Sequence, residues 1–287
     1  MKIIAVGNMK GGVGKTTTSI ILADTISAIL DKRVLALDLD PQANLSWSLL
    51  GPSAFHSHAE SSSMARWLED AAAGQSPRLT GTLEDVGLWG GSERPKSERA
   101  VLKLAVASTR MRFGEMEFEG PSASDPSHRL TDQLRTSLRE IRKNFDYCIM
   151  DCSPAFSALT RAALRLADAI VVPTPLNALC FESQEVFRTL GVRGMLKLST
   201  EIFVVRTRVG AAMGRAEQNQ IATRLIERQN DGLIRQLSPD FPETVDYMRA
   251  MNPPELGPHS TLKSKYGSRV DDLRAFAASL KKHGVVS

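Results

Sequence analysis

Residues 3–20 read IIAVGNMKGGVGKTTTSI. This stretch nearly matches the phosphate-binding loop G-x-x-x-x-G-K-[ST]. When the pattern is aligned on the G-K-T of residues 14–16, its first glycine falls on Met9, and a second lysine, Lys10, follows. An apolar, β-rich run precedes the glycines and a helical pattern follows them. The sequence therefore predicts a strand, a tight loop and a helix, the arrangement in which backbone N–H groups surround a phosphate.

Apolar runs alternate with helical periodicity along the remainder of the chain. We expect strands at residues 2–8, 33–40, 102–108, 145–151, 168–174 and 201–207. We expect helices at residues 16–30, 129–145, 161–167 and 216–229. Strands that are apolar throughout and alternate with helices predict an α/β fold, a mostly parallel sheet with helices on both faces. Ligands of such sheets bind at the carboxyl ends of the strands.

The chain of 287 residues is expected to form a single domain, 1–287. Residues 51–100 are rich in Ser, Ala, Gly and charge, and we interpret them as a surface insertion with one short helix near 64–73. Loops are expected at 120–129 and 252–260, and a last helix at 268–282.

Composition narrows the class of protein. A net charge of +4 permits a nucleic-acid partner without requiring one. The three cysteines, Cys148, Cys152 and Cys180, have neither metal nor redox spacing and indicate reduced thiols. No run reaches the roughly 18 apolar residues of a membrane span, and the N-terminus does not have the pattern of a signal peptide. We expect a cytoplasmic protein.

The glycine loop predicts nucleotide chemistry. Lys15 is expected to hold the β- and γ-phosphates of ATP, and the Thr16 hydroxyl is expected to bind Mg²⁺. A glycine-rich turn that only joins a strand to a helix is the alternative, and the G-K-T-T string in this setting disfavours it.

The string K-G-G-V-G-K-T-T-T resembles the deviant P-loop of the ParA/MinD ATPases, whose relatives include the nitrogenase iron protein. The resemblance implies a homodimer that forms on ATP binding, in which Lys10 crosses the interface and contacts the partner's nucleotide. Such a cation would neutralise charge that develops during phosphoryl transfer; the alternative is a solvated surface lysine. The implied nucleotide-binding residues are Lys10, Gly11, Gly12, Val13, Gly14, Lys15, Thr16 and Thr17.

Two carboxylates end the strand in ALDLDPQANLS, residues 36–46. A carboxylate there can position water or support a metal's shell, or it can cap a turn, since D-P is common in turns. The D-L-D-P-Q string resembles the ParA-type switch segment. The resemblance implies that Asp40 orients the attacking water and that Asp38 supports either the Mg²⁺ shell or the fold.

YCIMDCSPAFS, residues 147–157, resembles the Walker B segment of the family, with D-C-S-P in place of the usual D-x-P-P. The resemblance implies that Asp151 holds Mg²⁺ through water; a strand-end aspartate with a structural role is the alternative. Residues 167–183 resemble the next strand and loop. There Leu176-Asn177 replaces a polar or acidic pair, so the partners of this loop are expected to differ.

Arg206 and Thr207 fall where the family contacts the nucleotide base. Between residues 188 and 235, nine basic residues face four acidic ones, so this segment is more positive than the whole chain. Such an excess suits binding to a phosphate backbone, or it is a solvated arginine-rich helix face. ParA-like dimers bind DNA without sequence preference through arginines of this region. The candidate DNA-binding residues here are Arg215, Arg249, Lys263 and Lys265.

The resemblance implies an ATPase that hydrolyses ATP to ADP and phosphate slowly, is stimulated by a partner protein and binds nucleoid DNA as a dimer. Cycling would partition or position a cargo: a plasmid, a chromosome or a protein assembly. The glycine loop starts within ten residues of Met1, which leaves no room before it for the helix-turn-helix of some plasmid partition ATPases. Operator-specific repression is therefore not expected.

Two other classes of protein remain open. One is a membrane-associated division-site regulator of the MinD type. The last helix has only a thin apolar stripe, Leu273, Phe276 and Leu280, which favours packing in the core over membrane binding. The other class is a metabolic reductase or ligase with a related loop. A reductase would need a cluster held by interface cysteines, and Cys152 and Cys180 do not match that pattern.

Overall fold

The structure is a computed structural model that describes residues 1–61, 63–86, 102–118, 125–210, 214–252 and 261–287. In these ranges one sheet has eight strands in the order β3-β4-β2-β5-β1-β6-β7-β8. Neighbouring strands are parallel except β3, which runs antiparallel to β4. The strands are β1 (Lys2–Val6), β2 (Val34–Leu39), β3 (Leu83–Asp85), β4 (Leu102–Ala105), β5 (Tyr147–Cys152), β6 (Ala169–Pro175), β7 (Ile202–Val209) and β8 (Arg235–Pro242).

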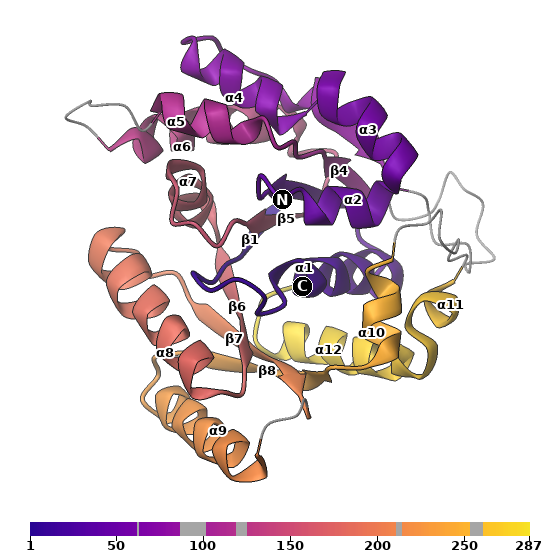
Figure 1. Cartoon of the computed structure of the whole chain (residues 1–287), viewed down its shortest axis with the longest axis vertical. Coiled ribbons are helices and arrows are strands. Elements are labelled where there is room, and N and C mark those ends of the chain that lie inside the picture. The colour runs from indigo at the N-terminus through magenta and orange to yellow at the C-terminus, as the bar shows by residue number, and fades with distance from the viewer. Residues whose placement is uncertain (62, 87–101, 119–124, 211–213, 253–260) are drawn as a thin grey trace.

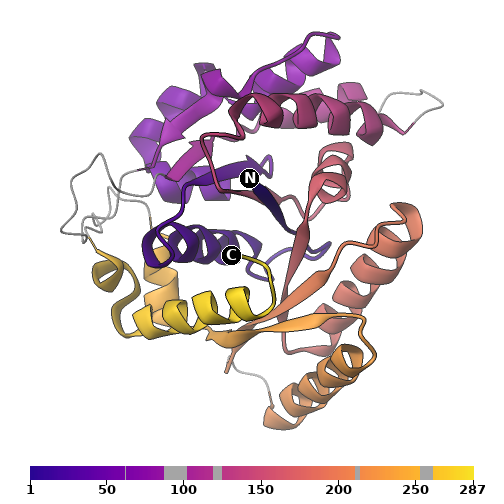
Figure 2. The same ribbon diagram turned by 180° about the vertical axis from the view of Figure 1, so that it is seen from behind.

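Helices cover both faces of the sheet (Figures 1 and 2). One apolar core lies under α4 (Met64–Ala72), α6 (Pro126–Ile141), α7 (Ala158–Leu166), α8 (Ala178–Val186) and α9 (Arg215–Asn230). The other lies under α1 (Lys15–Asp24), α2 (Asn44–Leu50), α10 (Val245–Ala250), α11 (Leu262–Tyr266) and α12 (Val270–Lys282). The described helices also include α3 (Pro52–Ser61) and α5 (Met111–Phe118), and π-helical segments follow α1 and α8 at Thr25–Ile29 and Phe187–Met195. The α/β fold predicted from the sequence is confirmed.

The interpretation of residues 51–100 as a surface insertion is wrong for the part that the structure describes. The expected short helix is α4, but it buries Trp67 and Leu68 in the core, and Trp67 donates a hydrogen bond of 3.0 Å from Nε1 to Ser137 Oγ on α6. The helix itself was expected, but the low average hydrophobicity of the segment concealed its strongly apolar face, because averages do not show periodicity. Residues 62 and 87–101 lie outside the described residues.

The expected last helix is α12, and its apolar stripe packs in the core as predicted. Leu273, Phe276 and Leu280 are fully buried. The expected loop at 120–129 is wrong for residues 126–129, which begin α6. Residues 120–124 and 253–260 of the two expected loops lie outside the described residues. No helix in the described part of the chain is long and apolar enough to cross a bilayer.

Candidate nucleotide site

The loop between β1 and α1 lies at the carboxyl end of the sheet. Gly12 and Gly14 have φ of +71° and +93°, a region in which a Cβ costs roughly 1–2 kcal/mol, so the backbone itself requires glycine there. Gly14 caps α1, and the helix directs its free N–H groups toward the space above it. The Val13 carbonyl accepts a 2.8 Å hydrogen bond from Thr207 Oγ1, which fixes the loop to β7.

Two lysines come from this loop and differ in burial. Lys15 is 7% exposed, and its Nζ donates to the Lys10 carbonyl at 3.0 Å. Burial lowers the pKa of Lys15, while the nearby carboxylates of Asp151 and Asp40 oppose that shift. The Lys10 side chain is half-buried, and its ammonium has no ion pair within the described ranges. Lys15 is thus turned into its own loop, and Lys10 remains available to another group.

Asp151 is the penultimate residue of β5, which lies beside β1, and it is opposite Val6 in register. Its carboxylate accepts hydrogen bonds from Thr16 Oγ1 at 2.8 Å and from Ser19 Oγ at 2.9 Å. Burial raises the pKa of Asp151 to about 6, against the effect of both hydroxyls. A threonine hydroxyl backed by a carboxylate is an oxygen pair suited to a hydrated Mg²⁺, which usually keeps several waters and takes few protein ligands. The residues present therefore fit the ion expected here.

The two carboxylates at the end of β2, Asp38 within the strand and Asp40 just after it, have different surroundings. Asp40 lines the pocket and is 7% exposed, and its Oδ1 accepts from the Gln42 N–H at 2.9 Å. Asp38 is fully buried. Its Oδ2 accepts from the Ser46 N–H at 2.8 Å and from Ser46 Oγ at 2.7 Å, and its Oδ1 accepts from the Asp40 N–H at 3.2 Å. Burial, and then the charge of Asp151, raises the pKa of Asp38 to about 8. Because its oxygens are used by α2 and the turn, this geometry favours the fold-supporting role of Asp38 over a magnesium ligand.

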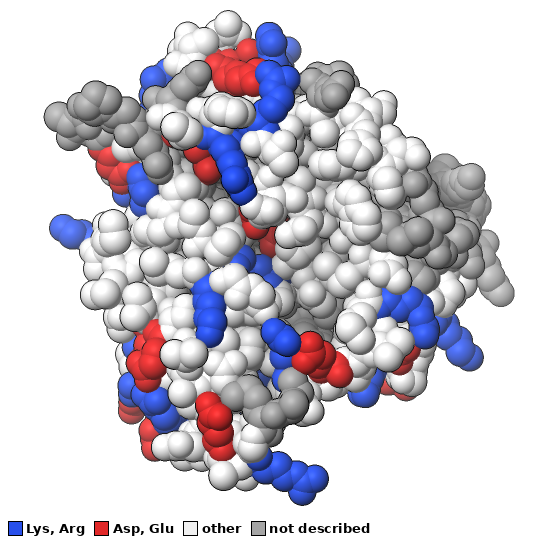
Figure 3. Space-filling model, in the orientation of Figure 1, with Lys and Arg blue, Asp and Glu red and all other residues white. Residues whose placement is uncertain are grey.

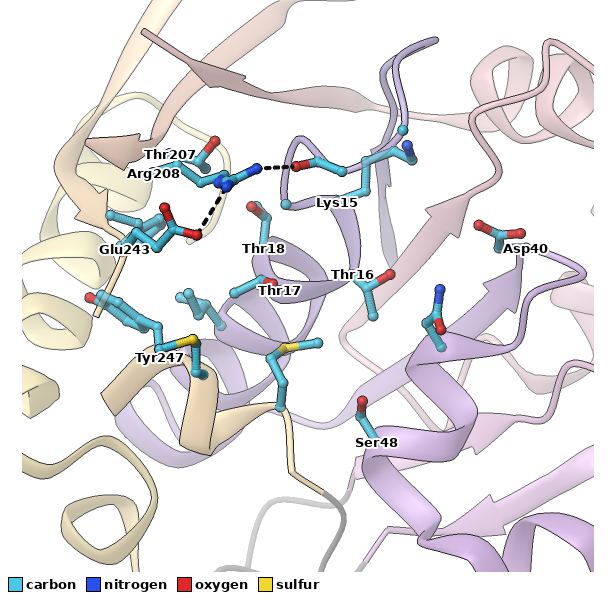
Figure 4. A pocket seen from close by; sticks show the side chains of 18 of the residues that line it. Lys15, Thr16, Thr17, Thr18, Asp40, Ser48, Thr207, Arg208, Glu243 and Tyr247 are labelled. Carbon is cyan, nitrogen blue, oxygen red and sulfur yellow. Dashed lines mark hydrogen bonds and ion pairs between the residues drawn. The ribbon is translucent and has the colours of Figure 1, made fainter. Parts of the chain in front are cut away.

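A cavity of about 670 Å³ extends around the amino end of α1 (Figure 4). Its side next to the glycine loop is lined by Lys15, Thr16 and Asp40. Its far side lies between the end of β7 and the segment that joins β8 to α10, where Thr207, Arg208 and Glu243 line it. This volume lies in the ordinary range for a small-molecule site. Thr17, expected to bind nucleotide, also lines the cavity, as do Gly11 and Gly12.

The expected base contact of Arg206 is not supported. Arg206 is absent from the lining of this cavity, and its Nε pairs with Asp240 Oδ1 at 2.6 Å. Side chains alternate along a strand, so Thr207 and Arg206 project to opposite faces of β7. Thr207 does line the cavity.

Arg208 and Glu243 were missed from the sequence. Arg208 donates to the Gly12 carbonyl at 3.3 Å and pairs with Glu243 at 3.0 Å, so the pair connects the loop to the end of β8 (Figure 4). Tyr247, from α10, completes this wall. No sequence motif marks this side of the cavity. The helical spacing of the VDYMRA segment (245–250) was the one sequence signal that a helix lies there.

The candidate DNA-binding residues separate into two groups. Arg215 and Lys263 are exposed, and Arg249 is exposed but lies 3.4 Å from Asp246. Lys265 is 2% exposed and forms a 2.6 Å ion pair with Asp24 of α1. The prediction that Lys265 contacts DNA is therefore wrong, because its charge is buried inside the fold.

The basic excess of residues 188–235 is also reduced by pairing. Carboxylates just outside that window neutralise arginines within it; the pairs are Arg188–Glu185, Arg228–Glu185, Arg206–Asp240, Arg208–Glu243 and Arg224–Glu182. Figure 3 shows basic and acidic side chains intermingled over the region of α8 and α9. Asn177, where the sequence departs from the family, caps α8 through a 2.8 Å bond from the Cys180 N–H to its Oδ1.

Comparison with known proteins shows the family of the chain. A model of an AAA domain family matches residues 1–192. The chromosome partitioning protein ParA of Caulobacter vibrioides is 33% identical over 210 residues, which cover 70% of this chain and 67% of that protein. The sporulation initiation inhibitor protein Soj of Bacillus subtilis is 31% identical over 60% of this chain and 57% of its own length. The match spans little more than half, 55%, of two relatives from Pseudomonas putida.

Solved structures show the same fold. The ATP complex of Cyanothece McdA(D38A) aligns with a TM-score of 0.69 at 20% identity, covering 100% of this chain and 98% of that one. Cobyrinic acid a,c-diamide synthase from Mycobacterium smegmatis, with bound ADP and magnesium, aligns with a TM-score of 0.67 at 21% identity over 99% and 96% of the two chains. At these identities the likeness shows the fold, and it is shared by proteins that bind ATP or ADP and magnesium.

Proposed function

Because the chain belongs to the ParA-type family of AAA domain ATPases, we propose that it is an ATP-driven switch that partitions or positions a cargo. The observation that carries the proposal is the grouping of Lys15, Thr16, Asp40 and Asp151 at one end of the sheet, with Lys10 on the outer part of the same loop.

Each of these residues has a role in ATP hydrolysis to ADP and phosphate. Lys15 exchanges its bond to the Lys10 carbonyl for the β- and γ-phosphates. Thr16 and Asp151 would hold Mg²⁺, whose charge would offset that of the phosphates. Asp40 lines the cavity beside them and orients the attacking water. Substituting Lys15 with Ala is expected to abolish nucleotide binding.

The dimer is the second part of the proposal. Lys10 has no ion pair within the described residues, and it lies on the loop that would face a second copy. We infer that ATP binding brings two chains together and that Lys10 contacts the nucleotide of the partner subunit. Lys10→Ala should then lower hydrolysis by a factor of about 10³, the smaller end of the range for an in-trans cation, and leave ATP affinity of the monomer intact. Lys32→Ala, outside the cavity, is the matched control; equal rates for the two variants would remove Lys10 from the mechanism.

The dimer is proposed to bind duplex DNA without sequence preference, which would give nucleoid association. Arg215, Arg249 and Lys263 are the exposed candidates. Since neighbouring arginines are paired with carboxylates, the contact would depend on few cations per chain and on two chains acting together. A partner protein is proposed to stimulate hydrolysis and release the dimer.

The two rival classes have less support. The apolar stripe of α12 is in the core, so it is not free to bind a membrane. Cys148, Cys152 and Cys180 are all buried, and burial raises the pKa of the first two thiols, so they are poor ligands for a cluster at an interface. Iron analysis and sedimentation with liposomes test these alternatives directly.

A further inference from the structure

Two adjoining cavities lie at the opposite end of β7 and β8 from the glycine loop. The first, of about 380 Å³, is lined by Arg193, Glu201, Gln229, Arg235 and His283, among others. The second, of about 280 Å³, is lined by Arg206, Gln229, Lys282 and His283, among others. Gln229 and His283 belong to both, so the two cavities form one groove between α9 and the end of α12.

The groove contains more positive than negative charge. Arg235 pairs with Glu201 at 2.7 Å, and Arg206 pairs with Asp240. Arg193 donates to the Leu198 carbonyl, and neither Arg193 nor Lys282 has a carboxylate partner in the part of the chain that the structure describes. Two cations are thus left without counter-ions in one hollow.

Arg193 and His283 are partly buried, and each has positive charge nearby. Burial, and then the charge of Arg188, lowers the pKa of Arg193. Burial, and then Lys282 and Arg235, lowers the pKa of His283, and Glu201 only partly opposes that effect. A bound anion would offset the positive charge around both groups.

We propose that this groove binds a small phosphorylated molecule, with Arg193 and Arg235 on the phosphate and His283 beside it. Guanidinium groups suit phosphate because their N–H donors match its oxygens in pairs. The groove is hollow, which favours a small ligand. Duplex DNA would instead require exposed cations on a flatter surface. The site is separate from the nucleotide cavity and does not rest on the proposed function.

The basic residues of the groove could instead have a purely structural role. The carboxyl ends of α9 and α12 point toward the groove, and basic side chains there offset the helix dipoles. That account predicts no response to phosphate beyond ionic strength, so the two can be separated by experiment.

The test uses the full chain with Lys15→Ala, which removes phosphate binding at the glycine loop. The imidazole resonances of His283 are followed through a pH titration in inorganic phosphate and in chloride of equal ionic strength, and His283→Gln assigns them. Phosphate is expected to raise the pKa of His283 by about one unit. Arg193→Gln and, separately, Arg235→Gln should remove the shift, while Lys281→Gln, exposed and outside the lining, should keep it.

An unchanged His283 titration in phosphate would overturn the proposal, and so would an equal shift in the folded Arg193→Gln and Arg235→Gln proteins. A shift caused by duplex DNA but not by inorganic phosphate would also overturn it, in favour of a DNA-contacting surface. If the parent chain does not bind ATP, the proposed function is refuted, but the phosphate-dependent titration of His283 still tests this groove.

Discussion

Lys265 provides the sharpest test of the packing beneath the nucleotide site. Its Nζ lies 2.6 Å from Asp24 Oδ2, and the two side chains are 3% and 0% exposed. The Tyr266 hydroxyl donates to the same oxygen at 2.5 Å. Asp24 ends α1, the helix that begins at the glycine loop, so this buried pair fixes α11 to that helix.

Lys265→Met keeps most of the side-chain volume and removes the charge. Asp24 would then be buried with one hydroxyl donor and no cation. Removing one partner of a buried ion pair costs about 3–5 kcal/mol, because the remaining charge is uncompensated. Lys263→Met, two residues away on the same helix and exposed, should change the free energy of unfolding by less than about 0.5 kcal/mol.

Urea denaturation, followed by circular dichroism, measures both variants. The double variant Asp24→Leu/Lys265→Met should be more stable than Lys265→Met alone, because no buried charge remains unpaired. DNA binding by Lys265→Met, measured where it is folded, should match the parent. A loss of less than about 1 kcal/mol, or equal stability of the Lys263→Met and Lys265→Met variants, would refute a buried pair.

Two further predictions concern local structure. Asp125 caps α6 and accepts a hydrogen bond from the Ser127 N–H, so Asp125→Ala should lower the free energy of unfolding by about 1 kcal/mol in urea denaturation. Burial opposes ionisation of Asp125, but hydrogen bonds from Ser127 and the charge of Arg161 lower its pKa to about 2. The stability difference between the parent and the variant should therefore be fully present above pH 3.8 and should fade as the pH falls toward 2. An undiminished difference at the acid end would contradict this. Gly14→Ala should abolish nucleotide binding in calorimetry, because the φ of Gly14 is +93°. Gly11→Ala is the control and should be as stable as the parent, since a Cβ at Gly11 meets nothing within 4 Å. An ATP affinity of the Gly14→Ala variant equal to that of the parent would contradict the loop geometry.

The central strands, and the side chains that the structure groups beside the glycine loop, could be predicted from the sequence. Buried parallel strands are continuous apolar runs, and the residues after them meet at one edge of the sheet. The glycine-loop motif singled out Lys15 and Thr16, and the family resemblance singled out Asp40 and Asp151; the structure groups all four at that edge. The edge strand β8 was missed because RQLSPDFP contains two prolines, which only an edge strand tolerates.

Side-chain direction and pairing were the parts that the sequence could not supply. Arg206 and Thr207 are adjacent, yet only Thr207 faces the cavity, since one residue along a strand reverses the face. Lys265 has the sequence context of an exposed cation, and its partner Asp24 is 241 residues away. The charge count over residues 188–235 overstated the free positive charge, because four carboxylates outside that window, Glu182, Glu185, Asp240 and Glu243, pair with arginines inside it.

The most direct test of the switch is the binding of random-sequence duplex DNA without nucleotide, with ADP and with ATP–Mg²⁺, at low and high salt. The proposal predicts binding with ATP–Mg²⁺ alone, which weakens steeply as salt rises. Asp40→Ala should stay bound to DNA because the nucleotide is not hydrolysed. Equal binding in all three states, or no binding by a chain that holds ATP, would contradict an ATP-dependent switch on DNA.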